Sequence, residues 1–244
     1  MNRRAAALAA IVAVVLGTGG CETTQQLSAK IGRRLGHQSA VAGTTSLGTA
    51  SRDVRVARTA LLTSGGQTAV ALQLTNTSAQ TQTDFPVLID VLDSAGGSVY
   101  RNNTKGIEAS IQQLALLPAH ATAWWVDNEI LASGGVPKTV RAQLGASASG
   151  AAAAVVPELT THGVSASESF PGPHVSVTID NRSAIPQTQL AVYAVALKGG
   201  QVVGAGRGVV AALAAGASAA LEIPMIGSVD GSTISLTVAP TRAG

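Results

Sequence analysis

LQLTNTS at residues 72–78 returns as VTIDNRS at residues 177–183, 105 residues further along the chain. Two more pairs of stretches match in the same order: DSAGGSV (93–99) with ALKGGQV (196–202), and LPAHATAWW (117–125) with LAAGASAAL (213–221). The spacing between matched stretches falls from 105 to 103 and then to 96 residues. We expect a falling spacing if the second copy has shorter loops between the same elements, so the chain contains a tandem pair of related units.

Short runs with alternating apolar and polar residues surround these repeats. They are VRVAR (54–58), AVALQL (69–74), VLIDVL (87–92), TVRAQL (139–144), HVSVTI (174–179), LAVYAVAL (190–197), QVVGAG (201–206), AALEI (219–223) and TISLTV (233–238). A period of two residues is typical of strands that pack one face inward. The pattern predicts an all-β protein with two tandem, small antiparallel β-sandwiches.

Turn residues separate these runs at matching places. Asn76 and Asn181 stand where strands end, and an asparagine side chain there bonds nearby backbone and tolerates left-handed conformations. The Gly-Gly pairs 96–97 and 199–200 permit tight hairpins. We therefore interpret the Asn-x-Ser triplets as turns.

The first copy also resembles the FxLYD-type domains of bacterial surface lipoproteins. In that family an aliphatic strand runs into an Asp-x-x-Gly hairpin, and residues 89–93 (IDVLD), followed by Gly96 and Val99, occupy the position of the name motif. Leu92 replaces the usual Tyr, and Ala196 replaces the Asp in the second copy. The resemblance covers residues 54–240 and implies immunoglobulin-like β-sandwiches in a cell-envelope setting, without catalytic residues.

The N-terminus has the layout of a secretory signal. Arg3 and Arg4 precede an apolar run at residues 5–16, which is short for a membrane span, and small residues follow it. Residues 18–21 (TGGC) resemble the lipobox of bacterial lipoproteins, with Thr18 in place of the usual aliphatic residue. That resemblance implies cleavage after residue 20 and attachment of acyl chains such as palmitate to Cys21. A secreted protein without acyl chains is the alternative.

The cysteine count and the charge balance exclude a disulfide-linked fold and a nucleic-acid-binding protein. Cys21 is the only cysteine, so no intramolecular disulfide is possible. Lys and Arg total 16 against 13 for Asp and Glu, and loss of Arg3 and Arg4 with the signal leaves 14 against 13. A balance of +1 is too small for a nucleic-acid footprint, so no nucleic-acid partner is expected.

The expected organisation has five parts. Residues 1–20 are a signal peptide, and residues 21–51 hold the lipidated Cys21 and a flexible tether rich in Thr, Ser, Gly and Gln. Residues 52–147 form the first β-sandwich, residues 148–157 a linker and residues 158–244 the second β-sandwich.

No stretch of the sequence matches a catalytic motif. The four histidines have no metal-ligand spacing, no serine lies in a GxSxG elbow, and GAGRG (204–208) lacks the Lys-Ser/Thr of a phosphate loop. His120 matches Gly216 of the second copy and is interpreted as a turn residue. The scattered acidic residues are assigned solvated or turn roles: Asp90, Asp93, Glu108, Asp127 and Glu129. We predict no catalytic residue, no metal site and no cofactor.

Trp124 and Trp125 stand out because the chain has only six aromatic residues. Adjacent strand residues point to opposite faces, so one indole enters the core and the other faces outward. The match to Leu221 favours Trp125 as the inward residue and Trp124 as the outward one. Trp124 then either binds a partner or a sugar, or is covered by the 101–112 loop or by the second domain.

These features together predict a membrane-anchored, extracytoplasmic lipoprotein that works without catalysis, as a protein-binding or spacer module of the cell envelope. Its expected partners are the membrane, through the lipid on Cys21, and an envelope protein. The alternative function is binding of a small molecule or a cell-wall glycan through Trp124 and the crevice between the domains.

Overall fold

The computed structural model describes residues 45–147 and 155–241, which belong to one compact unit. The predicted signal peptide, Cys21 and residues 148–154 of the linker lie outside the described residues. We call residues 45–147 the first half and residues 155–241 the second half. No helix among the described residues is long and apolar enough to cross a membrane.

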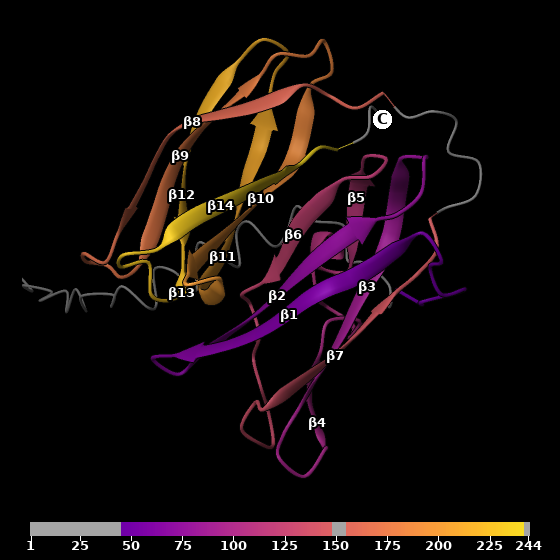
Figure 1. The fold of residues 1–244 in the computed structure, drawn as a ribbon, viewed down its shortest axis with the longest axis vertical. Coiled ribbons are helices and arrows are strands. Elements are labelled where there is room, and N and C mark those ends of the chain that lie inside the picture. The colour runs from indigo at the N-terminus through magenta and orange to yellow at the C-terminus, as the bar shows by residue number, and fades with distance from the viewer. Residues whose placement is uncertain (1–44, 148–154, 242–244) are drawn as a thin grey trace, which may run out of the picture. The chain divides into compact units, whose positions relative to one another are not determined.

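Antiparallel β-strands make up both halves (Figure 1). The elements of the first half are β1 (Val54–Ser64), β2 (Gln67–Asn76), β3 (Gln82–Leu92), β4 (Ser98–Arg101), the 3-10 turn η1 (Ala109–Ile111), β5 (Gln113–Leu117), β6 (Thr122–Asp127) and β7 (Thr139–Leu144). Those of the second half are β8 (Leu159–Ser167), β9 (His174–Asn181), β10 (Gln187–Lys198), β11 (Gln201–Leu213), β12 (Ser218–Pro224), β13 (Ile226–Gly227) and β14 (Thr233–Ala239). The predicted all-β, antiparallel class is confirmed.

Strand order is the same in the two halves, except that the second half has an additional short edge strand, β13, paired with β11. The first half has a β1-β2-β6 sheet, and its β3 pairs with β4, β5 and β7. The second half has the matching β8-β9-β12 sheet, and its β10 pairs with β11 and β14. One continuous strand, β11, stands where the first half has β4 and β5 separated by residues 102–112. That insertion accounts for the last fall in the spacing of the repeats.

Asn76 shows why the repeated triplet ends a strand. Its Nδ2 donates to the backbone oxygens of Gln80 at 2.8 Å, Leu117 at 3.2 Å and Pro118 at 2.9 Å. Its Oδ1 accepts from the backbone nitrogen of Ser78 at 3.0 Å and from the Ser78 hydroxyl at 2.9 Å. The buried amide thus ties the end of β2 to the turn that precedes β6.

Asn181 makes the same contacts in the second half. Its Nδ2 donates to the backbone oxygens of Ile185, Leu213 and Ala214, and its Oδ1 accepts from the backbone nitrogen and hydroxyl of Ser183. Both asparagines are 1% exposed. The turn interpretation of the two Asn-x-Ser triplets is confirmed, and the repeat read in the sequence is a repeat of hydrogen bonds.

The turn before β6 and its counterpart before β12 are equivalent as well. His120 has φ 57° and Gly216 has φ 72°, both in the left-handed region. In the following residue the backbone oxygen of Ala121 accepts from the nitrogen of Asn76, and that of Ala217 accepts from the nitrogen of Asn181. The prediction that His120 is a turn residue is confirmed.

We expect Gly216→Ala to lower the free energy of unfolding by about 1 kcal/mol, because a Cβ disfavours positive φ. Nothing lies within 4 Å of a Cβ added at Gly216, so backbone strain is the whole cost. His120→Ala is the matched control and should change stability by less than about 0.5 kcal/mol, since His120 already carries a Cβ at this position. Urea unfolding of both variants checks the pair, and equal losses would contradict the account.

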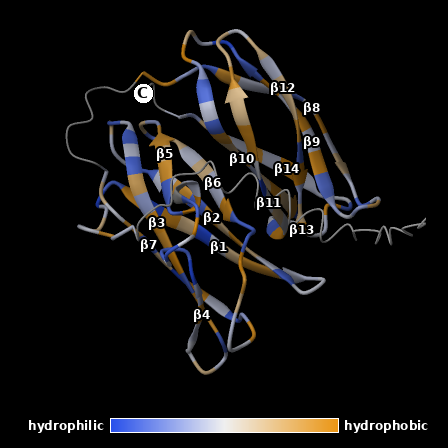
Figure 2. Ribbon diagram, turned by 180° about the vertical axis from the view of Figure 1, so that it is seen from behind, coloured by the Kyte–Doolittle hydropathy of each residue, from blue (hydrophilic) through white to orange (hydrophobic). Residues whose placement is uncertain are grey.

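Two clusters of buried apolar side chains make up the core. Hydrophobic and hydrophilic residues alternate along many of the strands that supply them (Figure 2). Strand β10 contributes to both clusters, because Leu190, Val192 and Ala194 belong to the second-half cluster. The residues between them, Ala191, Tyr193 and Val195, belong to the cluster that holds the first-half core. Strand β10 is therefore buried on both faces, and its outer face is covered by the first half.

Candidate functional site

The most elaborate side-chain arrangement lies where the halves meet, and we call this contact the seam. Strands β1, β2, β5 and β6 supply its first-half side, and β10, β11, β13 and β14 supply its second-half side. Its apolar part joins Trp124 and Val126 of β6 to Tyr193 and Val195 of β10 and Ala205 of β11. Burial of such side chains supplies most of the attraction between packed sheets.

Trp124 lies in the seam and is 3% exposed. Its backbone nitrogen donates across the seam to Thr237 Oγ1 at 2.9 Å. The Arg58 guanidinium lies 5.9 Å from the centroid of the Trp124 ring and donates to the backbone oxygen of Gly200 in the β10–β11 hairpin. Of the alternatives open for Trp124, coverage by the second half is the one observed, and the ring has no free face for a ligand in this structure.

Trp125 is fully buried among the apolar residues of the first-half cluster, so its predicted inward orientation is confirmed. Its indole Nε1 has no hydrogen-bond partner among the described residues. The two neighbouring indoles thus lie on opposite faces of β6, as strand geometry requires.

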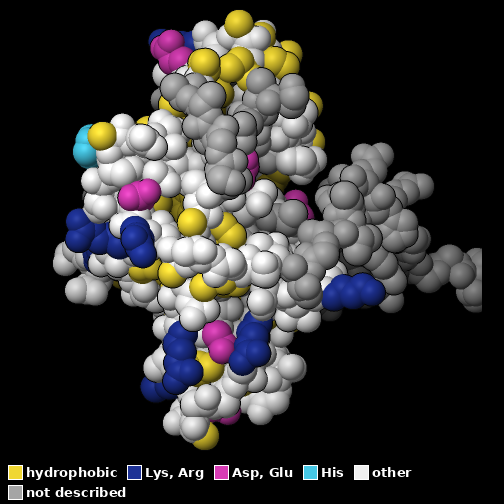
Figure 3. Space-filling model, turned by 90° about the vertical axis from the view of Figure 1, so that its right-hand side faces the viewer, with side chains coloured by type: hydrophobic (Ala, Val, Ile, Leu, Met, Phe, Trp, Pro, Cys, Tyr) yellow, Lys and Arg dark blue, Asp and Glu magenta, His cyan; other side chains and the backbone are white. Residues whose placement is uncertain are grey.

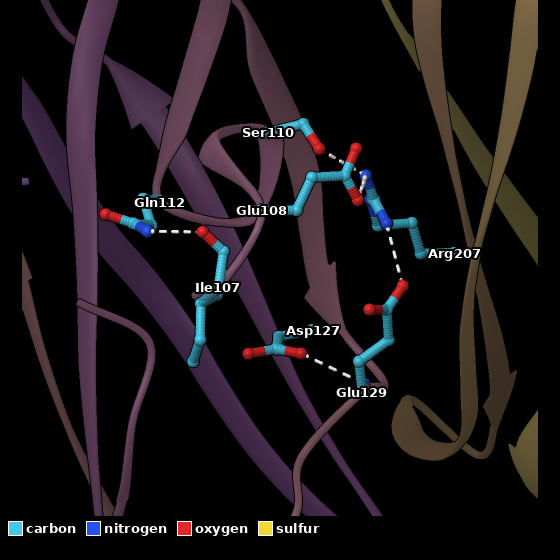
Figure 4. Close-up of polar contacts among 7 residues, drawn as sticks. All are labelled: Ile107, Glu108, Ser110, Gln112, Asp127, Glu129 and Arg207. Atoms are coloured by element: carbon cyan, nitrogen blue, oxygen red, sulfur yellow. Dashed lines mark hydrogen bonds and ion pairs between the residues drawn. The ribbon is translucent and has the colours of Figure 1, made fainter. Parts of the chain in front are cut away.

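Arg207 is the polar centre of the seam and is 5% exposed (Figure 4). From β11 its guanidinium reaches three groups of the first half. Nη1 lies 3.2 Å from Glu129 Oε1, Nη2 lies 3.5 Å from Glu108 Oε2, and Nη2 also donates to Ser110 Oγ. A planar guanidinium serves several acceptors at once, which suits a buried contact of this kind.

The inserted segment 102–112 presents two of these groups. Fully buried Asn102 anchors the segment by donating from Nδ2 to the backbone oxygens of Val87 and Ile111, each at 2.8 Å, and by accepting from the backbone nitrogen of Ile89 at 2.8 Å. Gln112 Nε2 donates to the oxygen of Ile107 at 3.0 Å (Figure 4). The second half has no counterpart of this segment. Glu108 and Ser110 of the segment nevertheless bind Arg207 of the second half.

Asp127, at the end of β6, is fully buried beside this cluster. The Tyr100 hydroxyl donates to its Oδ2 at 2.7 Å, and the Glu129 backbone nitrogen donates to its Oδ1 at 3.0 Å. Burial raises the pKa of Asp127 to about 6, and these two hydrogen bonds offset part of the rise.

The pKa values of the two tyrosines beside the cluster are raised as well. Burial, followed by the neighbouring Asp127 charge, raises the pKa of Tyr100. Burial also raises the pKa of Tyr193 to about 12, although Arg207, opposite it in the β10–β11 ladder, opposes the rise. Both phenols therefore stay protonated and keep a hydroxyl to donate at neutral pH.

The prediction that the acidic residues are solvated or in turns was only partly right. Asp93 is a turn residue, because its Oδ1 accepts from the backbone nitrogens of Ala95 and Gly97. Asp90 lies on the exterior, 3.2 Å from Arg101, and on the face drawn in Figure 3 basic and acidic side chains lie close together. For Asp127 the prediction of a solvated side chain was wrong, since this residue is fully buried. The side chains of Glu108 and Glu129 are 28% and 58% exposed, as solvated residues can be, and both also pair with Arg207.

Sequence reasoning missed Arg207 because GAGRG was tested only as a phosphate loop. The signal was present: VVGAGRGVV at residues 202–210 places one charge in the middle of an otherwise apolar strand. A charged side chain in a strand is either exposed or buried in contact with groups of opposite charge. The apolar residues on both sides of Arg207 favour burial.

The histidines do not come together in the second half. His162 Nδ1 lies 3.2 Å from Asp180 Oδ2, and His174 Nδ1 lies 2.8 Å from the backbone oxygen of Gly172. Within residues 45–147 and 155–241, no three His, Cys, Asp or Glu side chains are placed to hold a metal ion.

No family model and no curated protein matches this chain. The fold therefore stands on the chain's own residues. The chain is an all-β protein with several small antiparallel sheets, joined across a seam that contains a buried arginine.

Proposed function

We propose that this chain is an extracytoplasmic lipoprotein, anchored through Cys21, whose two immunoglobulin-like β-sandwiches act together as one rigid spacer or protein-binding module of the cell envelope. The observation that carries the proposal is the seam, with Arg207 inside it and β10 buried on both faces. Two domains joined only by a linker would move independently, whereas a buried polar and apolar contact fixes their relative orientation.

The repeated strand order supports the sandwich architecture and the resemblance to FxLYD-type domains. In each half, side chains from the two sheets share a core cluster, as the layers of a sandwich do. The Asp-x-x-Gly run at residues 93–96, on which the resemblance rests, forms a tight hairpin, with Gly96 at φ 82° and the Gly97 backbone nitrogen donating to Asp93 Oδ1. Both observations agree with a small extracellular binding or spacer domain.

One edge strand supports the protein-binding part of the proposal. Strand β8 lies at the end of the β12-β9-β8 sheet, and its residues from Thr161 to Ala166 are exposed. Among the described residues β8 pairs with β9 alone, so its other edge presents backbone groups. An extended segment of another protein can add to such an edge. No observation favours the alternative of glycan binding, because the Trp124 ring is covered.

Fractionation of cells that express the full chain tests the anchor. We expect the wild-type protein in the membrane fraction, with an intact mass that corresponds to cleavage before Cys21 plus acyl chains, and Cys21→Ser in the soluble fraction. Acyl chains give stable membrane attachment only when more than one is present, so the mass also reports their number. A wild-type protein without acyl chains, or a Cys21→Ser variant that stays in the membrane fraction, would contradict the proposal.

A further inference from the structure

Each half contains two sheets, and the seam uses the outer face of only one sheet from each half. The first half contributes the outer face of β1-β2-β6, and the second half contributes the outer face of the sheet that holds β10, β11 and β14. The matching sheet of the second half is β8-β9-β12, and the matching sheet of the first half holds β3, β4 and β7. The two outer faces that remain, which we call the free faces, are therefore counterparts of the two faces that bind each other in the seam.

A constant offset of 105 residues shows which positions correspond in β3 and β10. Asp84 of β3 and Gln189 of β10 are separated by this offset, and both have positive φ, at 45° and 51°. The same offset relates Val195, whose side chain lies in the seam cluster, to Asp90 on the free face of the first half. The repeat of strand geometry thus allows the seam to be compared with the free faces residue by residue.

Pairing across the sheets extends this comparison to the neighbouring strands. In the seam, Val195 pairs with Ala205 of β11 and Ser235 of β14, which are both uncharged. The matching row on the free face of the first half carries three charges, on Arg101 of β4, Asp90 of β3 and Arg141 of β7. Two guanidinium groups on either side of one carboxylate leave this arginine row with a net charge of +1.

The free face of the second half carries a carboxylate at the place that matches a seam residue. Val126 of β6 pairs with Ala71 of β2, and Glu222 of β12 pairs with Ser176 of β9, which follows Ala71 by 105 residues. Val126 and Val195 belong to the same seam cluster. Glu222 is exposed and has no ion pair among the described residues. Where the seam has apolar side chains on both of its faces, the free faces therefore have charges of opposite net sign.

We propose that a second copy of this chain stacks head to tail on these free faces, with Glu222 of one copy against the arginine row of the next. Such a contact leaves one free face at each end of the pair, so further copies can add. The contact lacks the apolar core of the seam, so electrostatic attraction drives it and salt weakens it. The proposal rests on the rigid module proposed above, because a fixed seam holds the two free faces in a constant relation.

Sedimentation velocity of the full chain tests the stacking. Cys21→Ser serves as the parent protein, so that no acyl chain can drive association. We expect the mean sedimentation coefficient to rise with protein concentration at about 20 mM salt, and the rise to be at least about fivefold smaller at about 500 mM salt.

Two variants of this parent each remove one side of the contact. Glu222→Gln removes the carboxylate, and Arg101→Gln combined with Arg141→Gln removes the basic groups, so each variant alone should stay monomeric. An equal mixture should form dimers and nothing larger, because each variant then supplies its one intact face. Asp230→Asn is the matched control, since Asp230 is an exposed carboxylate in the turn before β14, and it should associate like the parent protein.

Thermal unfolding of every protein checks that the fold is intact. A folded parent protein that stays monomeric at low salt overturns the stacking and leaves the seam and the lipid anchor standing. Association that persists in Glu222→Gln or in the arginine double variant also overturns it. So does a mixture of the two that stays monomeric or grows beyond dimers.

Discussion

Arg207→Ala should lower the free energy of unfolding by about 3 kcal/mol, because it removes the one buried cation of a cluster that holds several carboxylates. The loss has two parts. The side-chain stem packs inside the seam at 2% exposure, so truncation leaves a cavity. Glu108 also loses its charge partner while its side chain is only 28% exposed. Glu129, at 58% exposure, reaches water and adds less, which places the estimate at the lower end of the range for broken buried pairs.

A second variant separates packing from charge. Arg207→Met combined with Glu108→Gln and Glu129→Gln keeps an unbranched side chain in the seam and removes the charges together. Replacement of a whole buried ion cluster by apolar and neutral groups is often close to neutral, so this triple variant should recover most of the loss. Urea unfolding measures both proteins. A loss below about 0.5 kcal/mol in Arg207→Ala would contradict a structural role for the arginine.

Asn181→Asp should destabilise the protein by more than about 3 kcal/mol at pH 7 and is expected to prevent folding under mild stress. The Asn181 amide donates to three backbone oxygens, of Ile185, Leu213 and Ala214, while 1% exposed. A carboxylate has no hydrogen to donate, so the substitution leaves three acceptors unsatisfied and adds a buried negative charge that faces them. Asn76→Asp should behave alike, because its contacts are equivalent.

Asn103→Asp is the control for the introduced charge, since Asn103 lies in a turn and is only half-buried. It should change stability by less than about 0.5 kcal/mol. Thermal unfolding of the three variants gives the comparison. Similar losses in Asn103→Asp and Asn181→Asp would show that the added charge, rather than the missing hydrogen bonds, is responsible.

Local patterns predicted the strands and turns because local forces make them. Alternation along HVSVTI fixes which residues enter the core, and the shared Asn-x-Ser triplets form the same hydrogen bonds 105 residues apart. The fall in repeat spacing also predicted a longer loop in the first copy, and residues 102–112 form that loop. Each of these features is determined by contacts between residues that are close in sequence or in adjacent strands.

The seam escaped prediction because it joins residues that no local pattern relates. Glu108 and Arg207 lie 99 residues apart and meet only once the halves dock. One signal was available: LAVYAVAL at residues 190–197 is apolar on both faces, which is typical of a strand covered on both sides. This apolar run indicates that other strands pack on the outer face of β10. Which strands these are depends on the complete fold, and they prove to belong to the first half.

The central claim, that the two halves form one rigid body across the seam, is tested most directly by NMR relaxation of backbone ¹⁵N nuclei. Amides in the strands of residues 54–144 and of residues 159–239 should report the same overall rotational correlation time, as one body requires. Arg207→Ala should make the two values diverge. Two shorter correlation times in the wild-type protein, each fitting a domain of half the size, would contradict the account.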